Sequence, residues 1–419
     1  MSKLSNLAET LIGSEIVKLG NAINDRIKQG EKIYNYTIGD FDPSIFPIPK
    51  RLEELIIESY KSHNTNYPPA DGVMELRQAV SKFINEREGV EYVTDEILIA
   101  SGGRPLIYTL FKTLVDKGDK VIYPVPSWNN NHYVHLTEGQ HCVIDATPEN
   151  NFMPTVEDIA PCLSGATLLC LCSPQNPTGT TLQKEQLGSI CDLVLDENRR
   201  RGDRDKKLYV MYDQMYWTLT YGTTEHFNPV SLRPEMKDYT IFVDGISKAF
   251  SATGVRVGWS FGPSNVISKM KAFLSHIGAW SPMAEQKATA KYLTENNNID
   301  AFLNSFKESL NERLIRLYKG VIALKDKGYA VDAITPQAAI YLTIKFDLSG
   351  KKTEEGTHLE DQSAVTAYLL SEAGLAIVPF YAFGAGKQSP WYRLSVGTCK
   401  LEEIDEMFGR LESALSRLS

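Results

Sequence analysis

Apolar residues follow two different periods along the middle of the chain. Short runs rich in apolar and β-branched residues have the length and composition of buried strands. Between most of these runs, apolar residues recur at helical spacing, as Leu106, Leu110 and Leu114 do. Strands that alternate with helices are typical of an α/β fold with a mostly parallel, doubly wound sheet. The predicted strands span 97–100, 120–124, 141–147, 167–174, 208–214, 240–246 and 257–262.

The pattern changes towards both ends of the chain. After about residue 300 it predicts a long amphipathic helix, followed by shorter strands and helices. Near the N-terminus an amphipathic helix precedes a Pro-rich segment, which predicts an extended arm after Gly39. Because 419 residues exceed what one hydrophobic core usually serves, we expect two domains. We expect a large domain over 51–300 and a smaller α+β domain formed by 1–50 and 301–419.

Composition narrows the classes of function. Apolar residues make up 42% of the chain and charged residues 23%, which is ordinary for a globular protein. The net charge of -8 argues against a surface that binds nucleic acid. No apolar run reaches the roughly 18 residues that indicate a membrane-spanning helix. We therefore expect neither nucleic acid nor a membrane as a partner.

The six cysteines show neither the spacing of a zinc site nor that of a disulfide framework. Two of them, Cys170 and Cys172, lie within a predicted strand and are expected in the core. Reduced thiols in the cytoplasm are the simplest interpretation. The other cysteines are Cys142, Cys162, Cys191 and Cys399.

One lysine, Lys248, stands just after a predicted buried strand, in the small and apolar run SKAFSATGVRVGW. Burial disfavours the charged ammonium, and the neutral amine is the form that makes a Schiff base. Arg256 follows in the same run, and its permanent charge suits a phosphate. Ser247, Lys248 and Arg256 together suggest a covalently bound, phosphorylated aldehyde, pyridoxal 5'-phosphate.

A second anion site is predicted where Gly102 and Gly103 separate a strand from a helix. The first turn of a helix offers free backbone N–H groups and the positive end of the helix dipole. In an α/β sheet such turns lie at the carboxyl ends of the strands, where ligands bind. A Gly-Gly pair alone is a weak signal, since it is often only a tight turn.

Further motifs occur in the order typical of one family: PSW at 126–128, SPQNPTG at 173–179, DQMY at 213–216 and WYRLSVG at 391–397. With them, the chain resembles the pyridoxal-phosphate-dependent aminotransferases of fold type I, the class I/II group that includes aspartate aminotransferase. The resemblance covers the chain from about Gly39 to its C-terminus. It implies the fold-type-I arrangement of a large domain with a doubly wound sheet and a smaller domain.

The resemblance implies a role for each motif residue around the cofactor ring. Asp213 would pair with the pyridine nitrogen and keep it protonated, so that the ring accepts electrons. Tyr216 and Asn176 would donate hydrogen bonds to the phenolic oxygen. Trp128 would stack on the face of the ring, and Lys248 would hold the cofactor as a Schiff base and carry protons.

Other residues are implied at the two ends of the site. The amides of Gly103 and Arg104 would bind the phosphate together with Ser247 and Arg256. Tyr67 would reach the phosphate of a neighbouring subunit, which implies a homodimer with shared active sites.

Substrate-binding residues are implied as well. Arg393 would clamp the α-carboxylate of the substrate by a bidentate fork, with the backbone of Gly39 nearby. Trp128 and Asn176 would also contact the substrate. The implied reaction is a ping-pong transfer of an amino group between an L-amino acid and a 2-oxo acid.

Arg104 bears on which substrate is used. In one bacterial subgroup of aspartate aminotransferases, the residue after the Gly-Gly turn is a Lys that binds the distal carboxylate, and Arg104 aligns with it. The other interpretation is that Arg104 contacts only solvent or the phosphate. We expect aspartate and 2-oxoglutarate as substrates, although the chain departs from the family pattern at 336–341 and 377–384, near the expected substrate entrance.

Two alternatives keep the cofactor and change the chemistry. The first is an aromatic or branched-chain aminotransferase, or a cysteine-conjugate β-lyase, on the same fold. The second is a regulatory protein that senses the cofactor, but such proteins carry an additional DNA-binding domain at the N-terminus. Only about 30 residues precede the arm here and the net charge is acidic, which disfavours that alternative.

Overall fold

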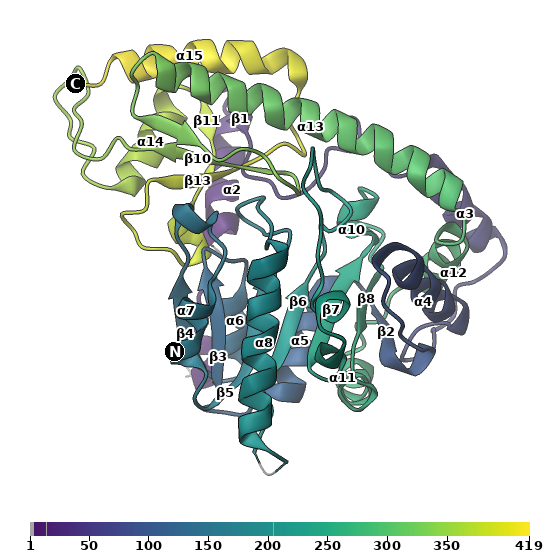
Figure 1. The fold of residues 1–419 in the computed structure, drawn as a ribbon. Coiled ribbons are helices and arrows are strands. Elements are labelled where there is room, and N and C mark those ends of the chain that lie inside the picture. The colour runs from purple at the N-terminus through teal and green to yellow at the C-terminus, as the bar shows by residue number, and fades with distance from the viewer. Residues whose placement is uncertain (1–3, 14, 204) are drawn as a thin grey trace.

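The computed structural model describes residues 4–13, 15–203 and 205–419 (Figure 1). Its centre is a seven-stranded sheet with the order β2-β8-β7-β6-β5-β3-β4. Strand β8 is antiparallel to both of its neighbours, and every other pair is parallel. Each strand predicted from the sequence is present, so the expected α/β class with a mostly parallel sheet is confirmed. The strands are β2 Ile97–Ala100, β3 Lys120–Val125, β4 Gln140–Asp145, β5 Ala166–Cys172, β6 Tyr209–Asp213, β7 Thr240–Gly245 and β8 Gly258–Phe261.

Successive side chains of a strand point to opposite faces of this sheet, and most of them are buried on both faces except in the edge strand β4, which is mostly exposed. In β5, Leu168 belongs to one apolar cluster and Leu169 to the other. Helix α8 (Lys184–Arg201), which crosses the near face in Figure 1, packs in the cluster of Leu169. Helices α5 (Gly103–Leu114) and α11 (Ser264–Ile277) pack in the cluster of Leu168.

The C-terminal part of the chain forms a second, four-stranded sheet with the order β12-β13-β10-β9. Near the N-terminus, β1 (Tyr34–Asn35) pairs in parallel with β11 (Leu375–Ala376), so the two ends of the chain share one core. The long helix α13 (Asn296–Asp326) joins this core to the large sheet (Figure 1). Its Leu303 packs in the large-sheet core and its Leu310 in the C-terminal core.

The remaining strands and helices have the following bounds. The strands are β9 Val331–Ala333, β10 Tyr341–Phe346, β12 Val378–Pro379 and β13 Trp391–Ser395. The helices are α1 Asn6–Thr10, α2 Glu15–Lys28, α3 Lys50–Lys61, α4 Met74–Glu88, α6 Asn130–Leu136, α7 Val156–Ile159, α9 Pro229–Leu232, α10 Ile246–Ala249, α12 Met283–Tyr292, α14 Gln362–Glu372 and α15 Ile404–Ser416. Among the helices of the described residues, none combines the length and the apolar character needed to cross a membrane.

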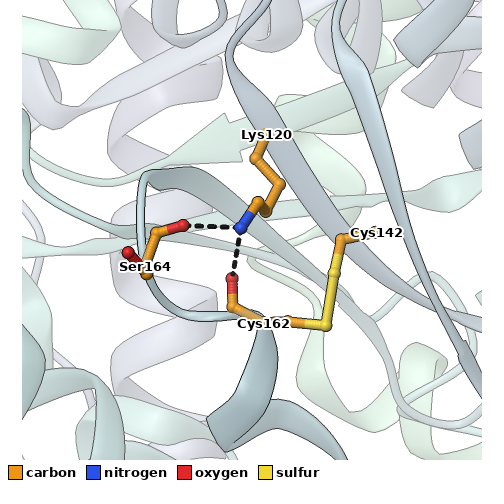
Figure 2. Close-up of a disulfide and its surroundings, with 4 residues drawn as sticks. All are labelled: Lys120, Cys142, Cys162 and Ser164. Carbon is orange, nitrogen blue, oxygen red and sulfur yellow. Dashed lines mark hydrogen bonds between the residues drawn. A yellow bond between two sulfur atoms is a disulfide. The ribbon is translucent and has the colours of Figure 1, made fainter.

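The expectation that all cysteines are reduced thiols is wrong for one pair. Cys142 in the edge strand β4 and Cys162 in a short 3-10 helix form a disulfide, with Cα atoms 6.4 Å apart (Figure 2). The Nζ of Lys120 donates to the carbonyl oxygen of Ser164 at 2.6 Å and fixes the adjoining turn. The pairing arises because the chain after β4 turns back along the sheet edge, which the spacing of cysteines does not reveal. The described free cysteines are Cys170, Cys172, Cys191 and Cys399.

Candidate active site

A cavity of about 330 Å³ lies beside the carboxyl ends of β5, β6 and β7. These ends meet because the parallel register places Cys172 opposite Asp213, and Asp213 opposite Val243. All but one of the site residues predicted from the sequence line this cavity. They are Gly39, Gly103, Arg104, Trp128, Asn176, Asp213, Tyr216, Ser247, Lys248, Arg256 and Arg393.

The exception is Tyr67, which does not line the cavity of its own chain. Its side chain is 83% exposed, and its ring packs edge-on against Trp280 with 5.6 Å between ring centroids. The geometry of one chain therefore gives Tyr67 no contact with this cavity.

Lys248 extends from α10, directly after β7, into the cavity. Its Nζ donates a hydrogen bond to the carbonyl oxygen of Gly39 at 2.5 Å. The pKa of Lys248 is lowered to about 8, chiefly by burial; Asp40 opposes this lowering, and the cations Arg393 and Arg256 contribute to it. A substantial fraction of the amine is therefore neutral near pH 8, as a nucleophile or proton acceptor requires.

Asp213 ends β6 and points into the same cavity. Burial raises the pKa of Asp213 to about 6, and the backbone N–H of Met215, which donates to Oδ1 at 3.1 Å, opposes that rise. A buried carboxylate is stabilised by a cationic partner. The site therefore offers a place for a protonated ring nitrogen.

An anion site occupies one end of the cavity, at the start of α5. Gly102 precedes the helix with a φ of +91°, and a Cβ at this position would lie 2.3 Å from Nη2 of Arg256. Arg256 itself is held by two backbone carbonyls, since Nη1 donates to Thr253 and Nη2 to Ser101, both at 2.6 Å. Gly102 is thus required for the close approach of this guanidinium to the helix N-terminus.

Arg393 extends from β13 of the smaller sheet and is only 2% exposed. Its Nη1 donates to Oδ1 of Asn176 at 3.0 Å, and its Nη2 donates to the carbonyl oxygen of Thr37 at 2.6 Å. The guanidinium lies over the ring of Tyr341 at 4.7 Å and that of Phe383 at 4.9 Å. These contacts fix a cation in the cavity, where it can bind a carboxylate.

The remaining predicted residues are Trp128 and Arg104. The guanidinium of Arg104 lies over the ring of Trp128 at 4.7 Å. Its side chain makes no hydrogen bond to any residue that the structure describes. Arg104 therefore has donors available for an anionic ligand.

Sequence reasoning did not assign Tyr341, Asp40 or Asn130, which also line the cavity. The hydroxyl groups of Tyr216 and Tyr341 are hydrogen-bonded at 2.5 Å. Tyr341 lies in the segment 336–341, one of the two segments that depart from the family pattern. In the other departing segment, Phe380 is fully buried against Phe152 and does not line the cavity.

The lining groups match the chemistry of pyridoxal phosphate from end to end. Backbone N–H groups, Ser247 and Arg256 suit the phosphate, Lys248 suits the aldehyde, and Asp213 suits the ring nitrogen. Arg393 and Arg104 supply further cations for carboxylates. The residues present therefore fit this cofactor together with an acidic substrate.

Comparisons with known proteins agree with this chemistry. A family model described as aminotransferase class I and II matches residues 33–411. The aspartate aminotransferase of Bacillus sp. (strain YM-2) is 29% identical over 411 residues, covering 98% of each chain. The structure of the Rhizobium meliloti aspartate aminotransferase matches with a TM-score of 0.91 and 26% identity over 100% of both chains. The Thermus thermophilus aspartate aminotransferase with maleate matches with a TM-score of 0.87 and 27% identity, over 99% of this chain and 100% of that one.

Proposed function

Because this chain belongs to the class I and II aminotransferases and depends on pyridoxal phosphate, we propose that it transfers an amino group between L-aspartate and 2-oxoglutarate. The observation that carries the proposal is the pair of guanidinium groups, Arg393 and Arg104, in one cavity. Two cations suit a substrate with two carboxylates. The similar enzyme from Thermus thermophilus was solved with maleate, which is also a dicarboxylate.

The cofactor, when bound, supplies an electron sink for the carbanion that forms when the substrate Cα–H bond breaks. We propose that Lys248 Nζ would take the proton from the substrate Cα as a base and would later give a proton back as an acid. Asp213 would hold the protonated ring nitrogen, and Tyr216 would donate a hydrogen bond to the phenolic oxygen. Arg393 binds the α-carboxylate and so orients the Cα–H bond towards Lys248.

Further roles proposed from the family motifs concern binding. The backbone N–H groups of Gly103 and Arg104 bind the phosphate group together with Ser247 and Arg256. Trp128 and Asn176 contact the cofactor and the substrate, and the backbone of Gly39 borders the α-carboxylate. A Cβ at Gly39 would lie 2.9 Å from the hydroxyl of Tyr341 and 3.4 Å from Nη1 of Arg393, which supports a Gly at that position.

The deciding experiment follows the cofactor absorbance during the half-reaction with an amino acid alone. We expect L-aspartate to convert the loaded enzyme, and Arg104→Ala to lower its kcat/KM roughly 10- to 100-fold, as loss of a charge-assisted hydrogen bond predicts. L-Alanine, which lacks the distal carboxylate, should react equally with both proteins. Arg104→Lys serves as the control, since it keeps the charge. Equal reaction of L-aspartate with wild type and Arg104→Ala would remove the dicarboxylate proposal.

A second candidate substrate is an aromatic or branched-chain amino acid. Apolar side chains also line the cavity, among them Ile16, Ile107 and Trp128. Faster reaction with such amino acids than with L-aspartate would favour this candidate. Sustained turnover without any 2-oxo acid would instead indicate a β-lyase.

We also propose a homodimer with shared sites, two domains and a cytoplasmic location. Exposed Tyr67 supports the homodimer, because it is free to reach a neighbouring subunit. The domain division is 51–300 against 1–50 with 301–419, and it is supported by one apolar core that draws mostly on 51–300 and another that draws mostly on the two ends of the chain. A cytoplasmic location implies that the Cys142–Cys162 bond is reduced in the cell, since cytosolic thiols are kept reduced.

A further inference from the structure

A buried polar cluster lies behind the cavity, on the other face of the same strand ends. Met211 and Val243 line the cavity, whereas Tyr212 and Phe242, one position away, pack in the core of the opposite face. By the same alternation, the side chains of Gln214 and Asp244 point to that opposite face. Gln214 is 0% exposed and Asp244 is 1% exposed.

Asp244 joins two turns that both carry site residues. Its Oδ1 accepts the backbone N–H of Gly245 at 2.7 Å, and Gly245 opens the turn that leads to Ser247 and Lys248. Its Oδ2 accepts Nε1–H of Trp217 at 2.9 Å, and Trp217 directly follows Tyr216. One carboxyl group therefore connects the Asp213–Tyr216 segment to the Lys248 turn.

The rest of the cluster holds these two turns from behind. Gln214 donates from its backbone N–H to the carbonyl oxygen of Val243 at 3.0 Å, and from Nε2 to Oε1 of Glu88 at 2.7 Å. Glu88, whose side chain is 2% exposed, extends from α4 and lies 3.7 Å from Nε2 of His226. Helix α4 is thereby connected to the end of β6.

Such a cluster is costly for a protein core. Burial raises the pKa of Asp244 well above its usual range, and the nearby charge of Glu88 raises it further. Apolar residues of similar volume usually stabilise a core as well as or better than buried charged groups. The geometry of the hydrogen bonds, rather than stability alone, accounts for a carboxyl group here.

We propose that Asp244 is a positioning residue, which fixes the segment of Asp213 and Tyr216 against the turn of Lys248 through Trp217 and Gly245. The inference rests on the proposed roles of Asp213, Tyr216 and Lys248. Misplacement of reacting groups by about 1 Å can lower a rate about 100-fold. Asp244 thus acts on the reaction without touching the cofactor or the substrate.

The test uses variants that remove the hydrogen bond between Asp244 and Trp217 by changing one partner or the other. Asp244→Asn keeps the size but leaves only one oxygen to accept two N–H groups, and Trp217→Phe keeps an aromatic ring without the donor. The matched control is Trp259→Phe. Trp259 packs on the same Phe83 ring as Trp217 does, at 6.5 Å against 5.9 Å, and its Nε1 has no hydrogen-bond partner among the described residues.

Four quantities are measured for each loaded protein. They are kcat and KM for whichever amino acid reacts fastest, the pH midpoint of the cofactor absorbance change, and the thermal unfolding midpoint. We expect Asp244→Asn and Trp217→Phe to lower kcat roughly 10- to 100-fold with KM within about threefold, and to shift the pH midpoint. The double variant should be no worse than the more affected single variant, because both remove one interaction. Trp259→Phe should lower only the unfolding midpoint.

Two outcomes would overturn the inference. If Asp244→Asn and Trp217→Phe behave like Trp259→Phe, or if their effects on kcat add fully in the double variant, the bond has no positioning role. If Lys248→Ala still forms the wild-type absorbance band, the proposed site itself is wrong and this inference falls with it. The first result leaves the proposed function intact, so the two failures are distinguishable.

Discussion

At the scale of single residues, the chemistry of Lys248 comes from its burial. The cavity removes water from the amine and surrounds it with Arg393, Arg256 and Arg104, so its pKa falls to about 8. The ammonium therefore destabilises the folded protein, because the unfolded chain can solvate it. Burial of Lys248 therefore makes its amine more reactive but lowers the free energy of unfolding.

This cost predicts a pH-dependent stability when the cofactor is removed. The folded pKa of about 8 is below the unfolded value of 10.5, so the penalty is full below pH 8 and disappears as pH rises towards 10.5. Relative to Lys248→Met, which cannot titrate, the cofactor-free wild type should gain about 2 kcal/mol in unfolding free energy between pH 7 and 9.5. Urea denaturation of both proteins at the two pH values measures this difference.

The Lys248→Met protein is itself the control, since every other titrating group is common to both chains. A difference between the two proteins that stays constant from pH 7 to 9.5 would show that Lys248 keeps an ordinary pKa.

Half of the residues that line the cavity were named from the sequence, because each of these stands near a strand end or in a motif. Lys248 and Asn176 follow predicted strands, Asp213 lies at the end of one, and the family resemblance, now confirmed, gave them an order. Tyr341 and Asp244 were not assigned. Their partners, Tyr216 and Trp217, are distant in sequence, and only the fold brings them together.

At the scale of elements, the strands of the large sheet were predictable from short apolar runs, since a sheet buried on both faces requires them. Asp71 precedes helix α4 (Met74–Glu88) and is a residue type that often caps a helix N-terminus. Val73, not Asp71, occupies the N-cap, and Asp71 instead pairs with Lys271 at 2.6 Å. Asp71 does not cap the helix because its carboxylate forms an ion pair with a residue that is distant in sequence.

The disulfide at the edge strand β4 gives a prediction at this scale. Purified, oxidised protein in denaturant should show four reactive thiols, and six after reduction, because Cys142 and Cys162 are paired. The bond closes a separation of 20 residues, so Cys142→Ser with Cys162→Ser should lower the unfolding free energy by about 3 kcal/mol. Since neither cysteine lines the cavity, kcat should stay within about twofold.

Thiol titration with and without reductant counts the reactive thiols. Chemical denaturation of the oxidised wild type and the double variant measures the difference in unfolding free energy. Cys191→Ser, which changes a free buried thiol, is the control for the substitution itself. Six reactive thiols in the oxidised protein would exclude the bond in solution.

At the scale of the whole molecule, the proposed dimer predicts complementation between two defective chains. A chain with Lys248→Ala keeps Tyr67, and a chain with Tyr67→Ala keeps Lys248. Refolded together, they should form hybrid dimers in which one site has both residues. The mixture should therefore be more active than either variant refolded alone.

Sedimentation should give twice the chain mass of 46.9 kDa for wild type and for each variant. The control for complementation is each variant mixed with itself under the same conditions. A mixture no more active than the better variant, with dimers present, would place Tyr67 outside the neighbouring site.

The strand order of the large sheet has a consequence for how the protein is made. A ribosome synthesises β2 early, yet among the described strands β2 pairs only with β8, which emerges far later. The nascent chain therefore carries β2 as an apolar strand without a partner while β3, β4, β5, β6 and β7 are synthesised. β1 likewise has no partner strand until β11 has been synthesised. Because the proposed phosphate site includes Arg256, we expect cofactor capture only after this residue has left the ribosome, and chaperones that shield unpaired strands have their longest opportunity before then.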